Sequence, residues 1–389
     1  MDYWLTLITA VVIVLSRLSL SFFALNEIKP SIISLFVVNF ALSIAFFNIY
    51  SPLILYFIFE ISVVPIFIII IGWGYQPERI KASYAMIFYT IISSVPIVIM
   101  LLTLNLFSPL VLRNLEANSR VRHSTFIISL CLTLGFLVKL PIYSIHLWLP
   151  LAHVEAPVFG SIILAGILLK LGGLGIVRFI TLFTRIQFKS LCISLRIVGA
   201  VIVGLTCLKL TDIKSVIAFS SVSHIGIVII IISIRLKLTI WAIFIIMLTH
   251  AFRSSIIFYC SYIIYKVTGT RNIILNKGAL SALPNFRICW LVAVIARIGT
   301  PPFVNLISEI YSIYLSLLIL GKWVVILVII FITGRAFHLV LYSSTQQEIF
   351  RWDNSRKLES RVSASSLVNS HSHSICLVFS IFILIELRI

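Results

Sequence analysis

Long runs of apolar residues fill this chain, and their length constrains its fold more than any other feature. Residues 53–73, for example, hold a single charged side chain, Glu60. About 20 such residues in an α-helix cross the hydrocarbon core of a bilayer. Because 61% of all residues are hydrophobic and only 11% are charged, a soluble domain is excluded. The sequence therefore predicts an all-α polytopic membrane protein.

Similar runs recur along the chain and leave room for about twelve transmembrane helices. We expect spans near residues 4–24, 32–50, 53–73, 83–107, 125–148, 157–179, 190–209, 214–234, 238–265, 284–320, 322–342 and 374–388. No cleavable leader precedes the first run, so we expect that run to stay in the protein as a span. The polar stretch 343–374 predicts a surface helix or a loop.

The basic residues give a formal net charge of +18 but are dispersed over loops such as 113–122 and 351–361. This distribution indicates anchoring to anionic lipid headgroups, cardiolipin included, and no nucleic-acid partner. Basic loops fall on both presumed sides, so membrane orientation stays open. The 6 cysteines stand singly, without the spacing of Fe–S or zinc sites. We therefore expect no redox centre and no bound metal in this chain.

Two of the expected spans contain helix-breaking residues. Pro141 and Pro150 follow the apolar run of the fifth span, and Gly299, Pro301 and Pro302 interrupt the tenth. Breaks at membrane depth persist only where neighbouring protein or a wet cavity satisfies the freed backbone groups. Two broken helices about five spans apart are typical of transport pathways built from two structural repeats. No clear sequence repeat accompanies them.

Several ionisable residues lie inside apolar runs, where each charge costs about 2.5–3.5 kcal/mol at the bilayer centre. They are Glu60, Lys139, Lys170, His224, His250 and Glu309. A carboxylate beside a lysine keeps the lysine charged, and separating the two favours the neutral amine, so proton release can be switched. Histidine can relay protons without a large driving force. Together these residue types predict a proton path.

Each of these residues also has a structural interpretation. An isolated lysine or glutamate can snorkel or form half of an ion pair, and His224 alone can be a hydrogen-bonded packing residue. Arg253, Arg297 and Arg335 are given no transport role. Gly172, Gly173 and Gly175 predict close helix packing rather than a nucleotide loop.

His146, His153 and Glu155 have a spacing that superficially resembles metal ligands. The intervening prolines oppose a single ligand-bearing helix, so we expect these residues to form the polar end of a broken helix.

Five blocks of this sequence resemble the chain 4 family of mitochondrial NADH-ubiquinone oxidoreductase, an antiporter-like membrane-arm family of respiratory complex I. The blocks are residues 139–157, 168–173, 212–226, 271–278 and 301–309, in the family's order and register. The resemblance extends from about residue 50 to the C-terminus. It implies an antiporter-like fold with two inverted repeats and two broken helices.

The resemblance also implies a role for each candidate residue. Glu60 would be the acidic modulator and Lys139 the proton-carrying lysine of the first half-channel. Lys170 would connect the half-channels along the central axis, and His224 and His250 would continue the relay. Glu309 would be the terminal carboxylate of the second half-channel, which favours chain 4 over chains 2 and 5. Arg253 and Arg297 depart from the small or polar residues expected at their positions.

By the same resemblance, residues 51–180 and 181–342 would form the two half-channel repeats. Residues 1–50 would be a shortened N-terminal pair of spans, and residues 343–389 a polar amphipathic segment with the last span. The implied enzyme is the H⁺-translocating NADH:ubiquinone reductase of the mitochondrial inner membrane. Neighbouring antiporter-like subunits, chains 2 and 5, would be partners, and other subunits would hold NADH, FMN, Fe–S clusters and ubiquinone.

Three other functions stay open at this point. A multi-subunit cation/proton antiporter shares the fold and the lysine pattern, and a structural membrane-arm subunit would use the same charges only to join helices. A solute carrier is a third class, but no substrate-shaped polar cluster supports it. Covalent catalysis is unsupported, since we find neither a nucleophile with its base nor a nucleotide-binding loop.

Overall fold

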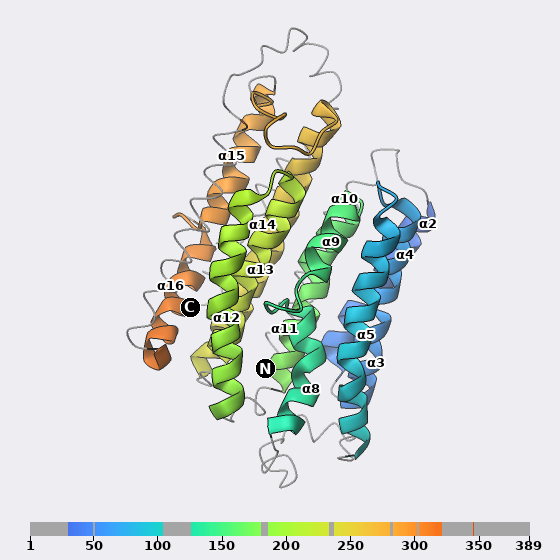
Figure 1. The fold of residues 1–389 in the computed structure, drawn as a ribbon, viewed down its shortest axis with the longest axis vertical. Coiled ribbons are helices and arrows are strands. Elements are labelled where there is room, and N and C mark those ends of the chain that lie inside the picture. The colour runs from blue at the N-terminus through green and yellow to red at the C-terminus, as the bar shows by residue number, and fades with distance from the viewer. Residues whose placement is uncertain are drawn as a thin grey trace.

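The computed structural model describes residues 30–49, 51–103, 126–179, 186–232, 237–280, 283–301, 303–320 and 345. In these ranges the regular elements are helices, and one isolated β-bridge joins Asp212 to Asn272. Most helices run side by side along the long axis of the molecule, with the earliest at one side and the latest at the other (Figure 1). The expected spans at 4–24, 322–342 and 374–388, and the polar stretch 343–374, lie outside the described residues except for Thr345.

The first group of helices comprises α2 (Pro30–Asn48), α3 (Pro52–Ile61), α4 (Val63–Trp73) and α5 (Arg79–Thr103). The span expected over 53–73 is interrupted at Ser62, a feature that the apolar pattern does not reveal. Pro65 cannot donate to a carbonyl four residues earlier, which weakens the helix at this point. At the interruption the Ser62 carbonyl accepts a hydrogen bond from the Asn39 side chain at 2.9 Å.

The central helices are α8 (Phe126–Lys139), α9 (Trp148–Glu155), α10 (Val158–Ile163), the π-helix η2 (Leu164–Leu168) and α11 (Leu169–Arg178). The break expected in the fifth span is confirmed, since α8 ends at Lys139 and α9 begins at Trp148. The indole of Trp148 donates to the Val138 carbonyl at 3.1 Å and so satisfies an acceptor freed by the break.

The last group comprises α12 (Ile186–Lys209), α13 (Ile213–Ile232), α14 (Lys237–Thr268), α15 (Pro284–Ile298) and α16 (Val304–Leu320). The expected break of the tenth span is also confirmed. Gly299 adopts a left-handed conformation with φ 76° at the end of α15, and α16 begins at Val304.

Seven helical stretches in the described part are long and apolar enough to cross a membrane. The most apolar windows of Val158–Arg178 and Ala242–Thr268 are 100% buried, whereas that of Arg79–Thr103 is only 33% buried. Large apolar side chains such as Tyr84, Phe88 and Ile288 are exposed on the outer helices, which fits contact with lipid. The segments Val158–Arg178 and Ala242–Thr268 are therefore shielded from lipid, and they carry Lys170 and His250.

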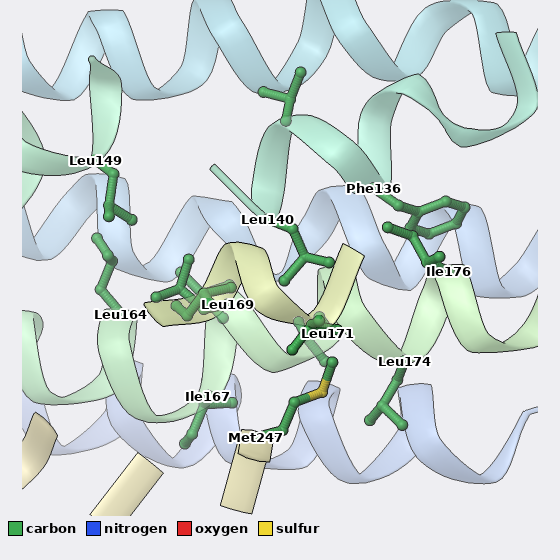
Figure 2. Packing of buried hydrophobic residues seen from close by; sticks show 14 of the residues in the cluster. Phe136, Leu140, Leu149, Leu164, Ile167, Leu169, Leu171, Leu174, Ile176 and Met247 are labelled. Atoms are coloured by element: carbon green, nitrogen blue, oxygen red, sulfur yellow. The ribbon is translucent and has the colours of Figure 1, made fainter. Parts of the chain in front are cut away.

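Glycines of α11 allow this centre to pack closely, as the sequence predicts. A Cβ at Gly172 would lie 3.0 Å from the Cβ of Lys139, and one at Gly175 would overlap the Phe136 ring at 2.2 Å. Figure 2 shows side chains of α8, α11 and α14 meeting in this layer, with Met247 of α14 beside α11. The close approach places Lys139 against the same helix that carries Lys170.

Candidate functional site

Lys139 lies at the last residue of α8, directly before the break, and its side chain is 2% exposed. Its ammonium group donates to the Phe59 carbonyl and lies 3.2 Å from the centroid of the Phe59 ring. The last residue of α8 is thus a buried lysine whose ammonium group contacts a carbonyl and an aromatic face.

Glu60 follows Phe59 in the chain, so the structure brings Glu60 and Lys139 to the same place. The two groups interact electrostatically but do not form a contact ion pair. The Glu60 Oε1 atom is buried and has no hydrogen-bond partner in the described part of the protein. A carboxylate near a buried lysine favours the charged form of the lysine.

Lys170 follows the π-helical turn of the sixth span and is 7% exposed. Its ammonium group donates to the Ala165 carbonyl inside that turn and lies 3.0 Å from Nδ1 of His250. π-helical turns disturb the regular hydrogen-bond ladder and often occur at functional sites. Here the turn supplies an acceptor to a lysine that would otherwise be buried in apolar surroundings.

His250 lies on α14, is 1% exposed, and joins the central helices to the last group. With Nδ1 at Lys170, its Nε2 has no hydrogen-bond partner among the described residues. His224 on α13 is also buried and acts electrostatically on His250. An imidazole can accept a proton at one ring nitrogen and release a proton from the other.

Glu309 on α16 is buried, and one of its carboxylate oxygens lies 3.8 Å from the guanidinium of Arg253. Arg253 stands one turn after His250 on α14. Arg297 on α15 is fully buried and donates to the Ile217 carbonyl at 2.9 Å and to the Ser220 hydroxyl. Glu309 therefore faces the guanidinium of Arg253, whereas the guanidinium of Arg297 is bound to α13.

Arg196 is a buried cation that the sequence analysis missed. Its guanidinium donates to the Val222 carbonyl at 3.1 Å, and it packs where a Cβ on Gly226 would overlap it at 1.8 Å. A charge within the apolar run 190–209 was the signal that could have found it.

His146, His153 and Glu155 do not come together as ligands. The His146 ring stacks on Tyr143, with ring centroids 5.3 Å apart, whereas the His153 ring stacks on Phe258 at 4.8 Å. The region of the chain that the structure describes contains no group of three His, Cys, Asp or Glu residues able to hold a metal. Glu155 ends α9, as expected for the polar end of a broken helix, and burial raises its pKa against the opposing charge of Arg271.

A family model described as "NADH:quinone oxidoreductase/Mrp antiporter, TM" matches residues 50–336. The chain belongs to this family.

Among the curated members, "NADH-ubiquinone oxidoreductase chain 4" of Aedes aegypti is 37% identical over 305 residues, covering 75% of this chain and 65% of the relative. The protein of the same name in Artemia franciscana is 36% identical over 317 residues, covering 77% and 78%. The chain spans about two thirds of the length of the Aedes relative.

Two solved structures share the fold. One is "Respiratory complex I from Thermus thermophilus with bound NADH", with a TM-score of 0.77, 18% identity, and 96% and 84% of the two chains covered. The other is the membrane-bound sulfane sulfur reductase, "an archaeal respiratory membrane complex", with a TM-score of 0.81, 19% identity, and 96% and 63% covered. The antiporter-like membrane fold predicted from the resemblance is confirmed.

Proposed function

We propose that this family member is a proton-translocating membrane-arm subunit of NADH:ubiquinone oxidoreductase. The contact between Lys170 and His250, at 3.0 Å, carries the proposal. It joins two ionisable groups from helices of different halves of the chain, both shielded from lipid. Ionisable side chains inside a membrane protein often mark ion or proton pathways. The names of the curated relatives give the complex in which this transport would operate.

In the proposed path, Glu60 modulates Lys139, and a change in their separation releases or retains the Lys139 proton. Lys170 then connects to the second half through His250, with His224 beside it. Glu309 accepts the proton at the end of this path. In this scheme the energy arrives from neighbouring subunits as a shift of buried charge.

The proposal places the chain in the mitochondrial inner membrane, beside the antiporter-like chains 2 and 5 and in contact with cardiolipin. The electron carriers NADH, FMN, Fe–S clusters and ubiquinone belong to other subunits. Residues 51–180 and 181–342 form the two half-channel repeats in this scheme. The helices of the first repeat, α3–α11, lie toward one side of the molecule and those of the second, α12–α16, toward the other, which supports that division (Figure 1).

The test is proton pumping by the assembled complex carrying Lys139→Ala or Glu309→Ala. We expect fewer protons pumped per NADH oxidised in each variant, because each lacks one proton-carrying group. Lys209→Ala is the matched control, since this lysine is exposed at the end of α12. Unchanged pumping stoichiometry in both variants would remove the assigned roles.

The family description also covers antiporters, so a cation/proton antiporter subunit is the second candidate. Purified native complex that oxidises NADH supports the first function, whereas sodium-dependent proton exchange without NADH oxidation supports the second. A purely structural subunit would show a third result: the substitutions would lower assembly and leave pumping per assembled complex unchanged.

A further inference from the structure

The C-terminal end of α9 is held by two cations from distant parts of the chain. The last carbonyls of a helix have no partner within the helix. Lys214 donates to the Ala156 carbonyl at 2.8 Å and to the Val154 carbonyl at 3.4 Å. Arg271 donates to the same Val154 carbonyl at 3.1 Å. Positive charge also interacts favourably with the negative end of the helix dipole. We call Lys214 and Arg271 the cationic clasp.

The two residues of the clasp are fixed to each other by backbone hydrogen bonds. The Ile213 N–H donates to the Arg271 carbonyl at 3.0 Å, and the Ile273 N–H donates to the Thr211 carbonyl at 2.8 Å. These bonds flank the β-bridge between Asp212 and Asn272. The start of α13 and the loop after α14 therefore move as one unit.

An aromatic wall surrounds the clasp. The Tyr75 ring lies 5.4 Å from the Lys214 ammonium and 5.3 Å from the Arg271 guanidinium, and the Tyr265 ring lies 5.4 Å from Arg271. Tyr75 belongs to the loop between α4 and α5. Tyr75, Lys214, Tyr265 and Arg271 are among the residues that line a pocket at this place. The loops at this end of the bundle thus converge on the carbonyls of α9.

Helix α9 connects the clasp to the break. Its first residue, Trp148, is bonded to the Val138 carbonyl next to Lys139, and its eight residues span about 12 Å. Near its other end, His153 is fully buried and stacks on Phe258 of α14, with an interplanar angle of 15°. Neither ring nitrogen of His153 has a hydrogen-bond partner in the described ranges. A shift of α9 would therefore reach both Lys139 and α14.

We propose that the cationic clasp mechanically couples the two half-channels, with α9 as the element that moves. The inference rests on the proposed function. When the first residue of α9, Trp148, shifts with Lys139, the carbonyls at the other end of α9 pull on Lys214 and Arg271. The start of α13 and the loop after α14 then follow. Helix α13 carries His224, so the movement reaches the second half of the relay. Lys214 and Arg271 act here as positioning residues, and Asp212 and Glu155 are the acidic groups beside them.

The test compares assembled complexes carrying Lys214→Gln or Arg271→Gln with the conservative variants Lys214→Arg and Arg271→Lys, which keep the charge and a donor. Protons pumped per NADH are measured in sealed vesicles, and assembly is measured on native gels. We expect both glutamine variants to lose as many pumped protons as Lys139→Gln does, and both conservative variants to recover most of that loss. Tyr75→Leu, which keeps both donors but removes the aromatic wall, should give a partial loss.

Three results overturn the proposal. The first is that both glutamine variants pump the parental number of protons per NADH while Lys139→Gln pumps fewer. In that case the proposed function stands and only the coupling fails. The second is failure of both glutamine variants to assemble, which would make the clasp a folding element. The third is equal loss in the glutamine and conservative variants. Full pumping by Lys139→Gln itself would instead contradict the proposed function.

Discussion

The ammonium nitrogen of Lys170 lies 3.0 Å from Nδ1 of His250, across the packing interface of α11 and α14. One turn further along α14, Arg253 faces Glu309 of α16 at 3.8 Å. Lys170 and Glu309 therefore contact side chains that lie one turn apart on α14. These contacts place Lys170, His250, Arg253 and Glu309 on three neighbouring helices, as the proposed proton path requires.

His250→Phe removes the ring nitrogen that contacts Lys170 while keeping a ring of similar size. We expect proton transfer through this chain to slow by about 10²–10⁴-fold, the usual contribution of a positioned proton-transfer group. The measurement is NADH-driven proton uptake by vesicles containing the assembled complex. His250→Gln retains a side-chain oxygen near Lys170 and should be the milder variant. Equal uptake in the phenylalanine variant and the parent would show that His250 is only a packing residue.

Arg253 and Glu309 should be energetically coupled. Breaking a buried ion pair by removing one partner leaves an uncompensated charge, a loss of about 3 kcal/mol for good geometry. We expect Arg253→Met and Glu309→Gln each to lower the thermal stability of the solubilised complex, and the double variant to lose less than their sum. Melting temperatures of the four proteins complete the double-mutant cycle. Strict additivity would mean that the two side chains do not interact.

Gly175→Ala tests the close packing of α11 against α8. The added Cβ would overlap the Phe136 ring, which itself packs against Phe59 and Phe179. Overpacking of this kind costs about 1–3 kcal/mol, so a lower melting temperature and less assembled complex are expected. Gly72→Ala is the matched control, because no atom lies within 4 Å of its added Cβ. Equal melting temperatures and equal assembly of the two variants would contradict the tight packing of α8 against α11.

The sequence predicted those parts of the fold that depend on local pattern. Apolar length located the spans, and the prolines at 141 and 301 located both breaks. The interruption at Ser62 escaped because it depends on Asn39, 23 residues away, as well as on the nearby Pro65. The π-helical turn before Lys170 escaped for a related reason: the local sequence is compatible with a continuous α-helix.

The candidate site was predictable by residue type but not by pairing. Charge within an apolar run indicated Glu60, Lys139, Lys170 and Glu309. The partners are another matter, since Lys139 binds the Phe59 carbonyl and Lys170 meets His250, each 80 residues away in the chain. Such long-range contacts leave no trace in periodicity. The cationic clasp was missed because its acceptors are backbone carbonyls 58–117 residues away, which leave no mark in the local sequence.

Asp212 should make stability depend on pH. Burial raises its pKa above the ordinary 3.8, against the hydrogen bond from the Lys214 N–H and the charges of Arg271 and Lys214. A raised pKa means that the folded state favours the protonated acid. The contribution to stability is therefore present below 3.8 and is lost as pH rises through the higher folded value. Asp212→Asn keeps an oxygen for the Lys214 N–H without the charge.

We accordingly expect the melting temperature of Asp212→Asn, relative to the parent, to rise with pH across the acidic range and then level off. Thermal unfolding of the solubilised complex at a series of pH values measures this difference. A difference that falls with increasing pH would mean that the surrounding cations, and not burial, dominate at Asp212.

Proton conduction along the proposed path is tested most directly at its midpoint, Lys170. The measurement is the number of protons pumped per NADH in sealed vesicles containing the Lys170→Met complex. Methionine keeps most of the side-chain volume but cannot carry a proton. The account predicts continued NADH oxidation with fewer protons moved per NADH than in the Lys209→Met control. The parental number of protons per NADH in the Lys170→Met complex would contradict it.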